Sequence, residues 1–455
     1  MGPDGSRQRP GPTVDPLTGE VTFRLDDDPR WRPRSVWFHL RAYGADPAFH
    51  PEDGQWVARI PRPPVDRLEY LLLVDWRDGG ESMITDPANP RRARGVFGDH
   101  SLLELPGYAP PWWIAVADAA EAQSRRDAQA ALAASRRAGG QRGTPWRRAR
   151  ALSTRAPSLV PIPDPGAGNP APDPPAEGIA SVRVRPRHPD DDRLRRSRVP
   201  QPAPAGALVV DPEQDPGPIV DEDAEVAVTG QLHVPSDSTP TEALPLLVVH
   251  DGPEYADLAQ LLRYLSTIAR IDPRLRSRVL LLAPVDRDRS YSASPAYARA
   301  LVTGMLPKVR RAVATRGRLV GMGASLGGLA MLHAATTHPG TFGGIFSQSG
   351  SFFRPRTDGQ ERGYRFYQRI VRFVDSVGVE PERLAGLHVT MTCGLGEENL
   401  ANNRSMARRL QRAGVTTELI ENPDGHNYTG WRDALDPGLR HLLAAAWDAA
   451  GNPPA

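Results

Sequence analysis

The chain of 455 residues contains a single cysteine, Cys393, so no disulfide can form within it. It has no apolar run long enough to cross a membrane, and the residues after Met1 lack the apolar core of a secretory signal. The formal net charge is only +2, too small an excess to indicate binding to nucleic acid or to a membrane surface. These absences favour a cytoplasmic protein with neither partner, and the sequence does not indicate an oligomeric state.

The length predicts two folded units with connecting material between them. Short segments that alternate apolar and polar residues predict a small all-β sandwich over residues 19–114. Residues 115–222 are poor in apolar periodicity, and 17 of the 48 prolines fall between Pro145 and Pro218. Such a segment buries too little surface to offset its ordering entropy, so we expect a long, largely disordered linker, with a helix-prone stretch over residues 115–137.

Strand and helix patterns alternate over residues 223–455, which is typical of an α/β domain with a mostly parallel sheet and helices on both faces. The expected strands are Ala224–Val234, Pro245–His250, Val279–Val285, Gly317–Met322, Gly343–Ser347, Leu387–Cys393 and Thr416–Glu421. The expected helices are Tyr255–Arg270, Ala296–Thr315, Tyr364–Val377, Asn402–Ala413 and Pro437–Ala449, and a further helix follows Gly327.

The segment Gly323-Ala324-Ser325-Leu326-Gly327 places a serine between two glycines, after an apolar strand and before a helix. A nucleophilic serine is presented on this kind of sharp turn, where the flanking positions leave no room for side chains. The five-residue pattern alone also fits a tight turn with a buried serine. The residues that follow along the chain must therefore decide between the two interpretations.

Ester hydrolysis by a serine needs a base and a supporting acid, which follow in the order serine, acid, histidine in an α/β-hydrolase sheet. The loop after the strand that ends at Cys393 carries Glu397 and Glu398, and the loop after the last strand carries His426. We favour Glu397 as the acid, although the sequence does not decide firmly between the two carboxylates. The other histidines near strands, His250, His333 and His338, are interpreted as structural, and Cys393 as a core residue.

The oxyanion of the reaction needs two hydrogen-bond donors. The backbone amide of Leu326 is one candidate, because it directly follows the serine. The loop after the strand ending at His250 should supply the other, and Gly252 is the better donor since Pro253 has no amide. Glu254 and Tyr255 are the fallback donors.

With these residues in place, the chain resembles the enterochelin (enterobactin) esterase family, within the esterase D-like group of α/β-hydrolases. The matching stretches of the second domain are LLVVHDGPEY, SASPAYARALVTGMLPKV, GMGASLGGLAMLHAATTHPGTFGGIFSQSGSF, CGLGEENLANNRSMARRL and PDGHNYTGWRDAL. In the first domain GQWVARI, RLEYLLLVDW and ITDPANPRRARGVFGDHSLLELPGYAPPWWI look like the immunoglobulin-like domain of that family. The order of the two domains also matches.

The resemblance implies Ser325 as nucleophile, His426 as base and Glu397 as supporting acid. It also implies hydrolysis of the serine trilactone of a ferric catecholate siderophore in the cytoplasm, with iron entering only as part of the substrate. Because such a substrate is anionic, guanidinium groups should line its pocket. The best candidates are Arg289 and then Arg287, although both also fit an ordinary solvated loop.

Other functions fit the same residues. The fold also serves esterases that act on a thioester, an acyl sugar or a mycolate, and acyltransferases. A non-catalytic protein that binds glycans or siderophores is a further alternative, because a protein can keep a hydrolase fold after it has lost catalytic activity. No spacing of cysteine and histidine predicts a metal site, and we expect no cofactor.

Overall fold

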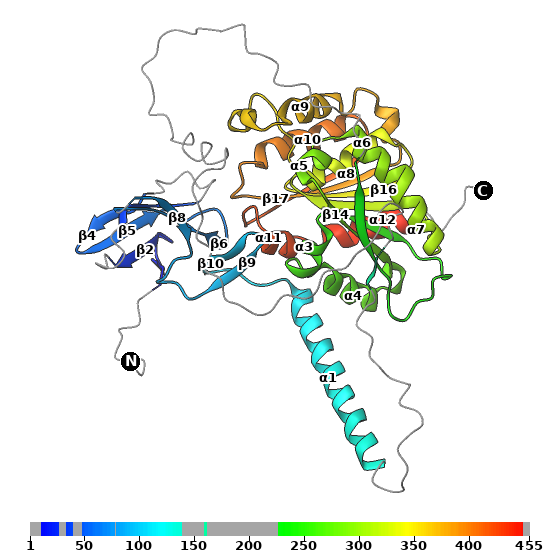
Figure 1. The fold of residues 1–455 in the computed structure, drawn as a ribbon, viewed down its shortest axis with the longest axis horizontal. Coiled ribbons are helices and arrows are strands. Elements are labelled where there is room, and N and C mark those ends of the chain that lie inside the picture. The colour runs from blue at the N-terminus through cyan, green and yellow to red at the C-terminus, as the bar shows by residue number, and fades with distance from the viewer. Residues whose placement is uncertain are drawn as a thin grey trace, which may run out of the picture. The chain divides into compact units, whose positions relative to one another are not determined.

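The computed structural model describes residues 11–26, 33–39, 48–77, 79–138, 159–161 and 226–448 (Figure 1). They form an all-β N-terminal domain and a second domain built on an eight-stranded sheet. Most of the expected linker, residues 115–222, lies outside the described residues. Within the described ranges, no helix combines the length and the apolar character needed to cross a bilayer.

The N-terminal domain consists of three small antiparallel sheets, with strand orders β1-β2-β5-β4, β6-β10-β9 and β3-β7-β8. Phe23 lies at its centre, with its ring 4.5 Å from that of Phe38 and 5.1 Å from that of Tyr70. The strands are β1 Thr13–Val14, β2 Val21–Asp26, β3 Pro33–Phe38, β4 His50–Glu52, β5 Gln55–Ile60, β6 Arg67–Tyr70, β7 Leu72–Trp76, β8 Glu81–Ile84, β9 Arg92–Gly95 and β10 Gly98–Glu104. The domain is all-β, as the alternating pattern predicts.

The large sheet has the order β11-β12-β14-β13-β15-β16-β17-β18. Its strands from β14 to β18 run parallel, while β11 and β12 join one edge as antiparallel strands. The strands are β11 Leu159–Pro161, β12 Val228–His233, β13 Leu246–Val249, β14 Arg278–Pro284, β15 Leu319–Ala324, β16 Phe342–Gln348, β17 His388–Gly394 and β18 Thr416–Asn422. The expected fold class, a mostly parallel α/β sheet after an all-β domain, is confirmed.

Both faces of this sheet are buried under helices, because successive strand residues alternate between two apolar clusters. In β13, Leu246 and Val248 join the cluster beneath α8, α9 and α10, whereas Leu247 and Val249 join the cluster beneath α1, α4 and α12. The helices are α1 Trp112–Ala138, α3 Gly252–Asp257, α4 Leu261–Ile271, α5 Arg287–Tyr291, α6 Pro295–Arg299, α7 Leu306–Ala312, α8 Leu326–Thr337, α9 Tyr367–Ser376, α10 Leu400–Arg412, α11 Tyr428–Asp433 and α12 Gly438–Asp448.

Two of the expected helices are divided in the structure. The helix expected over Tyr255–Arg270 consists of α3 and α4, separated at Gln260, whose φ of 52° is left-handed. A π-helical stretch, Ala300–Met305, separates α6 from α7 in the second one. The helix-prone stretch expected over residues 115–137 is part of α1, which begins at Trp112 and buries Trp113 against Tyr264 of α4.

Candidate active site

Ser325 stands on a strained turn between β15 and α8. Its φ is 55° and its ψ is −125°, a combination that a residue with a side chain rarely adopts. The turn is tight enough that a Cβ on Gly323 would lie 2.5 Å from the carbonyl carbon of Gly327. Glycine is therefore required at position 323, and the serine hydroxyl is held at the carboxyl end of the central strand, as the sequence predicts.

The carboxylate of Glu397 and the imidazole of His426 lie together at the neighbouring strand ends. Glu397 Oε2 is 2.8 Å from His426 Nδ1, and the Glu397 side chain is only 2% exposed. Its other oxygen, Oε1, accepts hydrogen bonds from the Ser349 hydroxyl at 2.6 Å and from the Gly394 amide at 2.8 Å. Glu398 is exposed instead, so of the two carboxylates only Glu397 is in position to orient the histidine.

Ser325 and His426 are not hydrogen-bonded to each other in the described residues. The Ser325 hydroxyl lies 3.1 Å from that of Ser351, and the Ser351 amide donates to the Ser325 carbonyl oxygen. The loop after β16 thus contacts both halves of the site, with Ser351 at the candidate nucleophile and Ser349 at Glu397. Catalytic hydrogen bonds are often long or poorly aligned without substrate.

The two candidate oxyanion donors begin helices after adjacent parallel strands. Gly252 is the first residue of α3 after β13, and Leu326 is the first residue of α8 after β15. His250 links the two turns, because its Nδ1 donates a hydrogen bond to the Gly327 carbonyl oxygen at 2.8 Å. Burial lowers the pKa of His250 to about 4, so its ring stays neutral and structural, as the sequence analysis expects.

Arg287 is held against the loop that carries Gly252. Its guanidinium makes hydrogen bonds of 2.8 to 3.1 Å with both oxygens of the Asp251 carboxylate, which is 7% exposed. Asp251 has a left-handed φ of 50° and directly precedes Gly252. Arg289 lies on the same short helix, α5, and its carbonyl oxygen accepts from Arg369. Substrate contact by either arginine stays a prediction.

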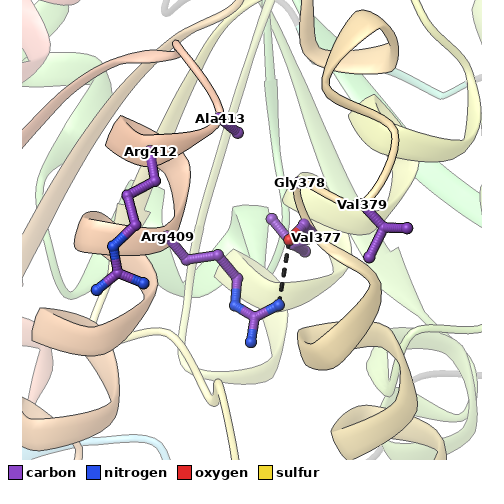
Figure 2. A pocket seen from close by; sticks show the side chains of 6 residues that line it. All are labelled: Val377, Gly378, Val379, Arg409, Arg412 and Ala413. Atoms are coloured by element: carbon purple, nitrogen blue, oxygen red, sulfur yellow. Dashed lines mark hydrogen bonds between the residues drawn. The ribbon is translucent and has the colours of Figure 1, made fainter.

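A surface hollow of about 260 Å³ lies elsewhere, at the ends of α9 and α10 (Figure 2). Helix α10 begins near the carboxyl end of β17 and ends where β18 begins. The hollow therefore lies near the amino ends of the strands, whereas Ser325 lies at the carboxyl end of its strand. The guanidinium of Arg409 in this hollow donates hydrogen bonds to the carbonyl oxygens of Asp375 and Val377. The hollow offers no nucleophile or base, and we assign it no catalytic role.

Two further titratable groups near the sheet are not catalytic candidates. Burial raises the pKa of the Cys393 thiol, which keeps it protonated within β17. His333 lies inside α8, and burial lowers its pKa to about 3. Among the residues that the structure describes, no three His, Cys, Asp or Glu side chains converge as a metal site requires.

Comparisons with known proteins find similarity to esterases. Residues 223–442 match the model of a family described as putative esterase. The chain is 26% identical over 226 residues to the iron(III) salmochelin esterase of Escherichia coli O6:H1. It is 28% identical over 210 residues to the iron(III) enterobactin esterase of Dickeya dadantii.

These alignments cover 46% and 44% of this chain, and 53% and 48% of the two relatives. The chain thus spans about half the length of the curated relatives that it matches. Solved structures extend the likeness in fold to both domains. The enterobactin esterase of Shigella flexneri, solved in the presence of enterobactin, matches with a TM-score of 0.58 at 16% identity, over 98% of this chain and 97% of that one. The ferric enterobactin esterase of Salmonella typhimurium also gives 0.58, at 17% identity over 98% of each chain.

Several residues of the site were not singled out by the sequence analysis. Ser349 and Ser351 lie in the stretch SQSGSF, which carries part of the family resemblance, so that stretch was the available signal. The contact between Arg287 and Asp251 had no such signal, because it depends on how two loops pack together.

Proposed function

We propose that the protein is a serine esterase that hydrolyses the trilactone esters of a ferric catecholate siderophore in the cytoplasm. The observation that carries the chemistry is the 2.8 Å contact between buried Glu397 and His426, together with a serine on a strained strand-to-helix turn. The curated relatives, which are named as iron(III) salmochelin and enterobactin esterases, support the substrate.

In the proposed reaction, Ser325 Oγ bonds to the ester carbonyl carbon while its proton passes to His426 Nε2. The carbonyl oxygen becomes an oxyanion, held by the amides of Leu326 and Gly252. The bond to the leaving alkoxide then breaks, and His426 returns the proton to that oxygen. Glu397 keeps the Nδ1 proton of His426 in place throughout, so that Nε2 is free to accept.

A water molecule completes the proposed cycle. It attacks the acyl-enzyme carbonyl and gives its proton to His426, which then protonates Ser325 Oγ as the acid product departs. Iron enters and leaves with the catecholate groups and forms no bond in these steps. The residues assigned here carry out the chemistry without a resident cofactor.

The test compares the wild-type chain with Ser325→Ala on p-nitrophenyl acetate and on ferric enterobactin. We expect both activities to fall to background in the variant, because the acyl-enzyme cannot form. The matched control is Ser376→Ala, at an exposed serine at the end of α9, which should keep wild-type turnover. Equal cleavage of either ester by Ser325→Ala would refute the catalytic proposal. A wild-type kcat/KM on ferric enterobactin no higher than on the simple ester would refute the proposal that a siderophore is the substrate.

A further inference from the structure

Arg67, on strand β6 of the N-terminal domain, is buried against the loop that carries His426. Its side chain is 1% exposed, and its Nε and Nη2 donate to Asp424 Oδ2 at 3.1 and 3.0 Å. Nη2 also donates to Asn427 Oδ1 at 2.8 Å, and Nη1 donates to Glu69 Oε1 at the same distance. One guanidinium therefore holds a residue on each side of His426.

Asp424 connects this guanidinium to both catalytic loops. Its Oδ1 accepts from the Gly425 amide at 2.7 Å and from Asn427 Nδ2 at 2.9 Å, which closes the turn around His426. Its carbonyl oxygen accepts from the Gly396 amide at 3.1 Å, next to Glu397 on the acid loop. A shift of Asp424 would therefore move His426 and Glu397 relative to each other.

Asn427 continues the connection into α11. Its Oδ1 accepts from the Gly430 amide at 2.8 Å and so caps the helix that begins directly after it. A main-chain hydrogen bond of 2.7 Å from the Asp66 amide to the Pro423 carbonyl oxygen lies beside it. The His426 side chain is 41% exposed, and its Nδ1 lies 2.8 Å from Glu397 Oε2.

The charges of this cluster depend on Arg67. Burial raises the pKa of Asp424 to about 6, so its carboxylate is ionised at neutral pH and needs a buried cation. Glu69 is the second carboxylate on Arg67, and His100 lies 3.2 Å from it. Loss of the guanidinium would leave two buried carboxylates facing each other without their cation, and the loop of Asp424 would have to open toward water.

We propose that Arg67 is a positioning residue for the esterase reaction, holding the base His426 in place through Asp424 and Asn427. This inference rests on the proposed function and extends it, since it assigns the N-terminal domain a part in the geometry of the catalytic loop. The alternative is an ion pair that only joins the two domains. Arg94 supplies the comparison, because it pairs with Asp257 of α3 while both side chains are more than half exposed.

The test measures kcat, KM and thermal stability of the full chain for Arg67→Met, Arg67→Lys and the control Arg94→Met. We expect Arg67→Met to lower kcat on p-nitrophenyl acetate by about 100-fold with KM changed less than about threefold, because small misplacements of a catalytic group cost rate more than binding. Arg67→Lys should have a kcat between those of Arg67→Met and the wild type, since lysine restores the positive charge but not the several fixed donors of the guanidinium. Arg94→Met should match the wild type.

The isosteric variant Asp424→Asn keeps the test decisive if Arg67→Met does not fold. We expect it to lower kcat by about tenfold or more, and the double variant Arg67→Met with Asp424→Asn to be no slower than the slower single variant, since both changes act through one contact. A folded Arg67→Met or Asp424→Asn with the kcat of Arg94→Met would overturn the proposal, as would losses that multiply in the double variant. Failure of the proposed function gives a different result, namely a wild-type turnover equal to that of Ser325→Ala.

Discussion

Replacement of Glu397 by glutamine should place the proton of His426 on the wrong nitrogen. The Oε1 position of Glu397 faces two donors, the Gly394 amide and the Ser349 hydroxyl. The Gly394 amide can only donate, and the Ser349 hydroxyl donates here while its oxygen accepts from Trp431 Nε1 at 2.9 Å. A glutamine must therefore keep its oxygen at this position and turn its amide group toward His426.

An amide group facing His426 Nδ1 reverses the hydrogen bond between them. Nδ1 must then accept, so the single proton of the neutral ring moves to Nε2, which can no longer take the proton of Ser325. The same substitution in a serine protease triad costs about 10⁴ in kcat, and we expect a loss of about that size here. This corresponds to about 5 kcal/mol of transition-state stabilisation.

The assay is the steady-state kcat for p-nitrophenyl acetate, measured beside the melting temperature of each variant. Glu398→Gln is the matched control, since it makes the same change at an adjacent, exposed carboxylate, and its kcat should equal that of the wild type. The glutamine at position 397 conserves volume, so the protein should remain folded. A folded Glu397→Gln that retains more than about a tenth of the wild-type kcat would show that this reasoning about the tautomer is wrong.

Three further predictions concern residues around the site. His333 binds no proton in the folded state until far below pH 6.5, because burial lowers its pKa to about 3. The unfolded chain binds that proton, so acidification from pH 7 to 5 should lower the free energy of unfolding by about 2 kcal/mol through this residue. In His333→Leu, the free energy of unfolding measured by urea titration should fall less between these two pH values. Gly252→Ala should lower kcat by at least about 100-fold, because the new Cβ would lie 2.4 Å from Leu281 Cα and displace the proposed oxyanion amide; unchanged turnover would exclude that amide. Arg287→Met should lower kcat on simple esters by about tenfold, since Asp251 loses its partner beside Gly252, whereas a higher KM confined to ferric enterobactin would indicate substrate contact instead.

The parallel sheet was predictable because its strands are continuous apolar runs, as in β13, which is buried on both faces. The order of Ser325, Glu397 and His426 was equally visible, since each follows an expected strand. The choice between Glu397 and Glu398 was not, because adjacent carboxylates on one loop have the same local signature and only burial separates them.

Other features depend on contacts that a local pattern does not contain. The division of the helix expected over Tyr255–Arg270 comes from one left-handed residue, Gln260, in a segment whose apolar periodicity continues across it. The contact between Arg67 and Asp424 joins residues 357 positions apart, and the sequence around either residue does not indicate its partner. Burial and partner choice of this kind are set by tertiary packing.

The contact between Arg67 and Asp424 also bears on how this protein can be divided or recombined. A fragment that begins at residue 223, where the family match begins, would contain Ser325, Glu397 and His426 in full. It would nevertheless present Asp424 without its guanidinium, so inactivity of that fragment would say nothing about the three residues themselves. Exchange of N-terminal domains between related esterases faces the same constraint, because the incoming domain must bring a cation to the position of Arg67. Under this proposal the two domains must be exchanged together, although the candidate reacting groups all belong to one of them.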